Sequence, residues 1–164
     1  MSDKLKSIGG PIGGFYFEVA CVDEGQIHFL VSSEKKGDLF KISVDDPIHF
    51  QHTEDGSMRA TFYDLATPNR NLHPLFAKNE RFFEVTDRKY VEWLAKERYR
   101  TMDEISEYEK LYIFFCANSF VEIISFDPPI FTRVSSKEEF YESIKERAVS
   151  YTHLRAHETK ANLV

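Results

Sequence analysis

Residues 15–32 read FYFEVACVDEGQIHFLVS, and this stretch decides the fold class. In each half every second residue is apolar: Phe15, Phe17, Val19 and Cys21, and then Ile27, Phe29 and Val31. Such alternation is typical of β-strands that bury one face. The triplet Asp23-Glu24-Gly25 separates the halves and suits a tight turn. The stretch therefore predicts an antiparallel hairpin, with the apolar side chains of each strand on one face.

Further strand patterns follow this hairpin. Alternation recurs over residues 38–44, and a shorter apolar run covers residues 48–52. After the turn Glu54-Asp55-Gly56-Ser57, residues 58–65 are another candidate strand. Residues 66–79 hold prolines and asparagines, which predict an irregular surface connection.

The second half of the chain mixes helices with a second hairpin. Residues 111–117 and 120–126 flank Asn118-Ser119, which predicts the hairpin, and residues 130–134 predict an edge strand. Three helix starts are indicated: Thr86 as the N-cap of a helix through residues 90–95, and the spacings Thr101/Glu104 and Ser136/Glu139 as capping boxes. Residues 82–85 form only a short apolar step before the first helix.

These patterns together predict an α+β fold, with a mainly antiparallel sheet of hairpins and two to three helices. Both hairpins are local, and no strand-helix-strand rhythm repeats along the chain. Residues 1–148 are expected to form a single globular domain because no linker divides them. The glycine-rich segment 1–14 is interpreted as a flexible leader.

The last residues, 149–164, resemble the translation of a sequencing adapter. The run VSYTHLRAHET matches one reading frame of such an adapter, and residues 160–161 would then belong to a variable barcode. The resemblance implies a non-native tail, with Arg147 as the last native residue. His153 and His157 stand four residues apart in this tail, as in some zinc sites, but a tail of this origin is excluded from functional reasoning.

Charge and cysteine content limit the classes of function. Without Arg155, Lys160 and Glu158 of the tail, 19 basic and 26 acidic residues remain, which is a net charge of −7. An acidic chain repels phosphate backbones, so nucleic-acid binding and adhesion to anionic membranes are disfavoured. Cys21 and Cys116 lie in apolar runs and are expected to be buried free thiols, which indicates a cytoplasmic protein.

The sequence holds no motif for catalysis, a cofactor or a metal between residues 1 and 148, so an enzyme is disfavoured although not excluded. Four histidines remain in that range. His49 and His52 are three residues apart in a predicted strand, so their side chains should point to opposite faces and not share a metal. His28 could act as a general base only with a partner that the sequence does not identify.

One stretch resembles a family. The segments YVEWL at 90–94, LYI at 111–113 and VEIIS at 121–125, followed by Pro128-Pro129, are similar to a pattern in small uncharacterised bacterial proteins. Some of those proteins are similar to immunity proteins of polymorphic toxin systems. The resemblance covers residues 82–134 and carries no functional residue. It suggests the setting of a toxin-immunity system but no mechanism.

Two hypotheses of function follow. In the first, the chain is an acidic binding protein, such as an immunity or inhibitor protein, and the carboxylates Asp103, Glu104, Glu107 and Glu109 contact a basic protein partner. In the second, it is a small enzyme or ligand-binding domain with its site in the 66–79 connection, where Arg70, Asn71 and His73 are the polar candidates. The sequence predicts no oligomeric state.

Overall fold

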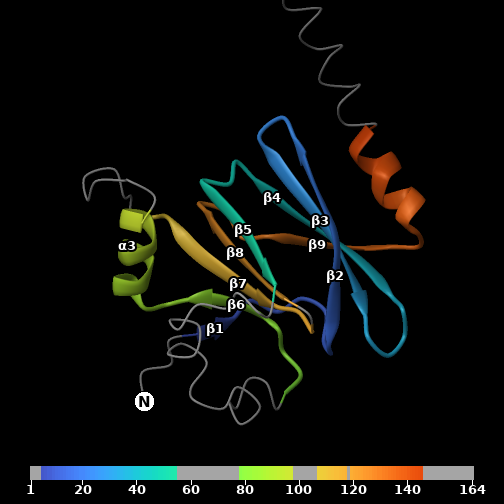
Figure 1. The fold of residues 1–164 in the computed structure, drawn as a ribbon, viewed down its shortest axis with the longest axis horizontal. Helices are drawn as coiled ribbons and strands as arrows, with labels where there is room; N and C mark the ends of the chain where they lie inside the picture. The colour runs from blue at the N-terminus through green and yellow to red at the C-terminus, as the bar shows by residue number, and fades with distance from the viewer. Residues whose placement is uncertain (1–4, 55–77, 98–106, 118, 146–164) are drawn as a thin grey trace, which may run out of the picture.

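The computed structural model describes residues 5–54, 78–97, 107–117 and 119–145. These ranges form two β-sheets and two helical segments (Figure 1). The strands are β1 (Leu5–Ser7), β2 (Phe15–Asp23), β3 (Gln26–Ser33), β4 (Leu39–Asp45), β5 (His49–Glu54), β6 (Phe82–Val85), β7 (Lys110–Phe115), β8 (Ser119–Ser125) and β9 (Ile130–Val134). Helix α3 spans Arg88–Glu97, and a second helix covers residues 137–145.

The strands form two sheets that pack face to face. Sheet A has the order β1-β6-β7-β8-β5, and sheet B has the order β2-β3-β4-β9. Each of the strand pairings is antiparallel. The predicted α+β class with mainly antiparallel pairing is confirmed in this broad sense, although strands far outweigh helices in the described residues.

The hairpin at residues 15–33 forms as predicted, but its first strand does not keep one apolar face. Phe17 pairs with Val31 while Val19 pairs with Leu30, so β2 contains one extra residue, a β-bulge at Glu18. A bulge reverses the alternation beyond it. Phe17 therefore faces sheet A, whereas Val19 and Cys21 face the opposite side of sheet B. The prediction of a single apolar face is wrong for this reason.

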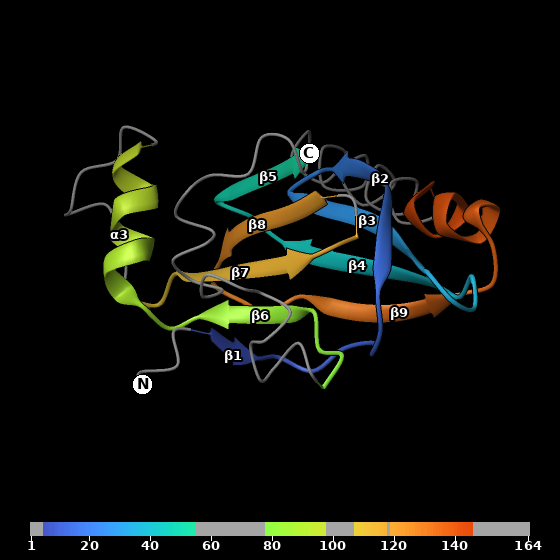
Figure 2. The ribbon, with the colours of Figure 1, turned by 60° about the horizontal axis from the view of Figure 1, so that its bottom comes forward.

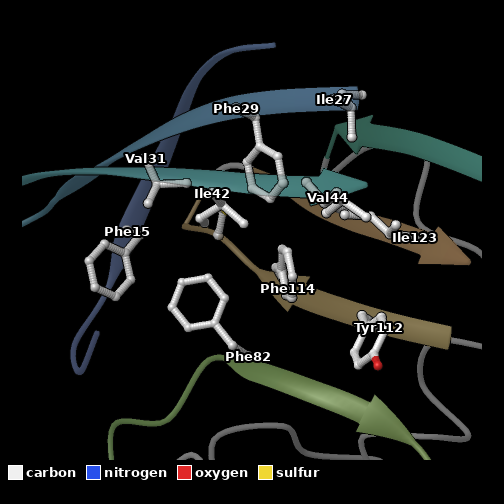
Figure 3. Packing of buried hydrophobic residues seen from close by; sticks show 12 residues of the cluster. Phe15, Ile27, Phe29, Val31, Ile42, Val44, Phe82, Tyr112, Phe114 and Ile123 are labelled. Atoms are coloured by element: carbon white, nitrogen blue, oxygen red, sulfur yellow. The ribbon is translucent and has the colours of Figure 1, made fainter. Parts of the chain in front are cut away.

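Aromatic side chains fill the space between the sheets. Figure 3 shows Phe29 of β3, Phe82 of β6 and Phe114 of β7 pointing toward one another from the two sheets. The ring centroids of Phe82 and Phe114 are 5.0 Å apart, and those of Phe29 and Phe114 are 5.5 Å apart. Tilted and edge-on aromatic pairs of this kind strengthen a core beyond the effect of buried area alone. This cluster joins the two sheets.

Each sheet also carries a helix on its outer side, so that α3, sheet A, sheet B and the 137–145 helix follow one another across the molecule (Figures 1 and 2). Val91 of α3 packs with apolar residues of sheet A that include Phe83 and Ile113. Phe140 of the second helix packs on Leu30 and Val134 of sheet B, with Ile144 beside it.

Two short strands were not predicted. Residues 5–7 form β1, and Leu5, which is only 2% exposed, pairs with Val85 at the edge of sheet A. Residues 82–85 form β6, which lies between β1 and β7. The assignment of residues 1–14 to a flexible leader is therefore wrong for residues 5–7, because they belong to the sheet.

The two helix starts in the described residues lie within one residue of the predicted positions. Asp87 caps α3, since its carboxylate accepts a hydrogen bond from Lys89 N at 3.1 Å and its carbonyl accepts one from Val91 N. The predicted cap was Thr86. Ser136 caps the second helix, where its hydroxyl accepts a hydrogen bond from Glu139 N at 3.0 Å, as predicted.

The remaining predictions concern the second hairpin, the edge strand and segments that the structure does not describe. The second hairpin forms between β7 and β8, but Cys116 N donates to Ser119 O, so its turn lies one residue earlier than predicted. Strand β9 is an edge strand of sheet B, as predicted. The predicted strand at 58–65, the connection at 66–77, the capping box at Thr101 and the tail lie outside the described residues.

Candidate functional site: the acidic end of the sandwich

Three connections meet at one end of the sandwich. The turn after β2 lies beside the link between β4 and β5, because Asp46 N donates to Gly25 O at 2.6 Å. The same link contacts sheet A, where Ile48 N donates to Ile124 O at 2.8 Å. The third connection leaves β8 just beyond Ile124 and leads to β9. We call the surface formed by residues 22–25, 45–48 and 126–130 the acidic end.

The charges of these connections have one sign. They contain Asp23, Glu24, Asp45, Asp46 and Asp127 but neither lysine nor arginine. All of these carboxylates except that of half-buried Asp23 belong to exposed residues. Of these carboxylates, Asp127 acts on the adjoining strand: the pKa of Tyr112 is raised to about 12 by burial first, then by the negative charge of Glu84 and then by that of Asp127. The acidic end therefore presents a negative potential to solvent.

Large apolar side chains are exposed among these carboxylates. Val22 is 81% exposed, Phe126 is 50% exposed and Ile130 is 59% exposed, and Ile48 also reaches the surface. Exposed apolar side chains gathered next to charged ones are typical of surfaces that bind another protein.

Local backbone geometry holds the turn against the β4–β5 link. Glu24, Gly25 and Asp46 all have positive φ angles, of 25°, 81° and 40°. A Cβ atom on Gly25 would lie 2.8 Å from Asp46 Oδ1, so glycine allows the link to approach closely. The side-chain amide of Gln26 also donates to the carboxylate of Asp45. These contacts give the acidic end a defined shape.

The carboxylates predicted from the sequence adjoin this end in part. Strand β7 begins at Lys110, which pairs with Ser125, so the preceding residues lead up to Phe126 and Asp127. Glu107 is exposed there, as expected of a surface contact. Glu109 is only 3% exposed, so its carboxylate does not belong to an exposed patch. Asp103 and Glu104 lie outside the described residues.

The three described histidines are built into the sheets. His28 is 2% exposed, and its Nδ1 lies 2.8 Å from Ser43 Oγ. The ring of His52 stacks on Phe17 of sheet B, while His49 faces the carboxylate of Glu122 at 3.7 Å. His49 and His52 thus point to opposite faces of β5, as predicted. The partner of His28 that the sequence did not identify is half-buried Ser43, but burial withholds the imidazole itself from a substrate.

Metal and thiol sites were the other kinds of site that the sequence raised. Residues 5–54, 78–97, 107–117 and 119–145 contain no group of three His, Cys, Asp or Glu side chains placed to hold a metal ion. Cys21 and Cys116 are free thiols, as predicted; Cys116 is buried and Cys21 is half-buried. Burial raises the pKa of Cys116 to about 12, which suppresses its reactive thiolate.

The alternative site in the 66–79 connection falls almost entirely outside the described residues, including Arg70, Asn71 and His73. Asn79, at its end, is described and has a φ of 59°. In the part of the chain that the structure describes, no helix combines the length and the apolar character needed to cross a lipid bilayer. Comparisons with protein-family models, curated proteins and solved structures found no match to this chain.

Proposed function

We propose that the chain is a stoichiometric protein-binding module that neutralises a basic partner protein, as immunity and inhibitor proteins neutralise toxins. The observation that carries the proposal is the acidic end, where carboxylates and exposed apolar side chains share three connections that contain no basic residue. A basic protein surface has the complementary charge. The module would act in the cytoplasm, where its two thiols remain reduced.

The two kinds of side chain at this end would do different work. Carboxylates steer an oppositely charged partner during encounter and raise the rate of association, an effect that salt screens. Exposed rings such as Phe126 gain free energy only once they are desolvated in the complex, so they govern dissociation. The exposed Glu107, together with Asp103 and Glu104, would extend the acidic surface along the segment before β7.

The experiment compares matched charge reversals. In one variant Asp127→Lys alters the acidic end and Glu107→Lys alters the segment next to it; in the control, Glu138→Lys and Glu142→Lys alter two exposed carboxylates of the 137–145 helix. Each immobilised protein is exposed to a lysate of the source organism. Any basic protein that the wild type retains is then produced recombinantly, and its binding rates are measured at low and high salt.

We expect the partner to bind the wild type and the control variant with similar rates. The Glu107/Asp127 variant should associate at least about tenfold more slowly, and salt should slow the wild type toward it. A further variant with Asp103→Lys and Glu104→Lys tests the segment before β7. Phe126→Ser should accelerate dissociation instead, with exposed Ile12→Ser as its control. If no basic protein depends on the acidic end in this way, the proposal is wrong.

A further inference from the structure

A pocket lies at the opposite end of the sandwich from the acidic end. Three segments distant in sequence enclose it: residues 11–15 before and at the start of β2, residues 33–40 around the β3–β4 turn, and residues 79–81 before β6. Its volume is about 380 Å³. Pockets that hold small organic molecules start at about 300 Å³. In Figure 1 the β3–β4 turn lies at the lower right, away from the β2–β3 turn at the top.

Backbone hydrogen bonds hold the walls of this pocket in place. Gly13 N donates to Asn79 O at 2.9 Å, and Glu34 N donates to Gly14 O at 3.0 Å. Ser33 N donates to Asp38 O at 2.8 Å and closes the β3–β4 turn. The pocket is therefore formed before any ligand arrives, which lowers the entropic cost of binding.

The pocket combines an aromatic base with charged walls. The rings of Phe15 and Phe40 meet edge to face, with centroids 5.9 Å apart, and both residues line the pocket. Phe15 continues into the core through its contact with Phe82, at 5.5 Å. Phe15 is only 1% exposed and supports this base from the core, so half-buried Phe40 offers the apolar surface to the body of a ligand.

Positive charge exceeds negative charge along the walls. Lys35, Lys36 and Arg81 line the pocket, against Glu34 and Asp38. Asp38 is already bound by Arg133, whose Nη2 donates to its Oδ1 at 2.8 Å. The three basic and two acidic residues of the lining give it a net charge of +1, in a chain whose total is −6. Arg81 is also oriented, because its Nη1 donates to the carbonyl of Glu80 at 2.8 Å.

We infer that this pocket binds a small organic anion, a carboxylate or a phosphate ester, with an aromatic or apolar body. The anionic group pairs with Arg81 and the two lysines, and the body lies on the ring of Phe40, which Phe15 supports from the core. This site differs from the acidic end in position and in the sign of its charge. The inference therefore goes beyond the proposed function and does not depend on it.

The test uses small probes that differ in charge and share one ring. Benzoate and phenyl phosphate are titrated into the full chain, alongside neutral benzyl alcohol and cationic benzylamine, and dissociation constants are read from amide chemical shifts. We expect at least one of the two anions to bind about tenfold or more tightly than the alcohol, and the amine to bind more weakly than the alcohol. The stronger of the two anions identifies the group that the pocket prefers.

Variants locate the binding. Arg81→Gln should lower the affinity for the preferred anion about tenfold, whereas Lys89→Gln on α3 should leave that affinity unchanged. If Arg81→Gln disturbs folding, the double variant Lys35→Gln and Lys36→Gln replaces it, because both lysines are exposed. The Glu107→Lys and Asp127→Lys variant should bind the anion normally even if it loses a protein partner. The inference is overturned if neither anion outcompetes the alcohol, or if the pocket variants bind it like the wild type.

Discussion

The extra residue in β2, Glu18, determines which side of sheet B the rest of that strand faces. Its carboxylate accepts hydrogen bonds from Ser32 Oγ at 2.5 Å and from Lys137 Nζ at 3.1 Å. These contacts lower the pKa of Glu18, with the Ser32 hydroxyl as the main cause. The bulge thus turns Cys21 away from the inter-sheet core and links β2 to the start of the 137–145 helix.

The reversed alternation predicts unequal reactivity of the two thiols. At pH 8, iodoacetamide should modify half-buried Cys21 well before Cys116, because Cys116 is buried and its pKa is raised to about 12. Peptide mass spectrometry during a time course measures both rates. In denaturant the two rates should converge. Equal rates in the folded protein would contradict this placement of Cys116.

The raised pKa of Tyr112 predicts that the protein loses stability at high pH. Its pKa is raised from 10.0 to about 12, so the unfolded chain releases this proton at a lower pH than the folded one. The contribution of Tyr112 is complete below pH 10 and is lost as the pH rises toward 12. By pH 12 the loss should be on the order of 1–2 kcal/mol. Chemical denaturation at pH 8 and pH 11.5 should show a steeper decline for the wild type than for Tyr112→Phe.

At the scale of residues, the sequence predicts the alternation of apolar and polar side chains along a strand, but it does not predict the bulge that shifts this alternation. The apolar positions of residues 15–32 were visible, and so was the hairpin. The bulge was not, since β2 remains apolar on both sides of Glu18 and either register buries apolar side chains. Only the pairing of Val19 with Leu30, together with the helix that covers Val19 and Cys21, reveals which register forms.

At the scale of elements, local pairing separates the strands that could be predicted from those that could not. Hairpins β2–β3 and β7–β8 are predictable because each consists of two neighbouring strand patterns joined by residues that favour a turn. Strands β1 and β6 are 3 and 4 residues long, too short for a pattern, and they pair with each other across a long stretch of chain. Nothing local marks Leu5-Lys6-Ser7 as a strand.

Because β1 is part of sheet A, it should contribute to stability. Leu5→Ala should lower the free energy of unfolding by about 2–3 kcal/mol, since it removes a buried side chain from the cluster under α3. Lys6→Ala, on the exposed side of the same strand, should change it by less than about 0.5 kcal/mol. Urea denaturation of both variants gives the comparison. Equal small effects would mean that residues 5–7 do not pack as described.

At the scale of the whole molecule, both candidate sites are assembled from distant segments. The acidic segment around Glu107 was visible because its carboxylates are adjacent in sequence. The acidic end brings together residues near 24, 46 and 127, and the pocket brings together residues near 13, 35 and 81. Neither set is a motif, so only the order of strands in the two sheets could place them together.

The tail gives a prediction for the molecule as a whole. If residues 149–164 derive from an adapter, they have not evolved to pack on the domain, and a chain that ends at Arg147 should keep the stability of the full chain within about 0.5 kcal/mol. Thermal unfolding of the two chains measures this. A fall of several degrees in the melting temperature of the shorter chain would show that the tail contributes to folding.

The pairing of β4 with β9 also orders events during synthesis. Leu39 pairs with Val134, and β1 can pair only once β6 has been synthesised. Neither sheet is therefore complete until most of the chain has left the ribosome. Until then the first hairpin and β4 carry an open edge, the kind of edge on which nascent chains associate with each other. Long-range pairings also delay folding, because distant segments must meet before any contact rewards them. This strand order predicts refolding on a time scale of roughly milliseconds to seconds, with higher yields at low protein concentration.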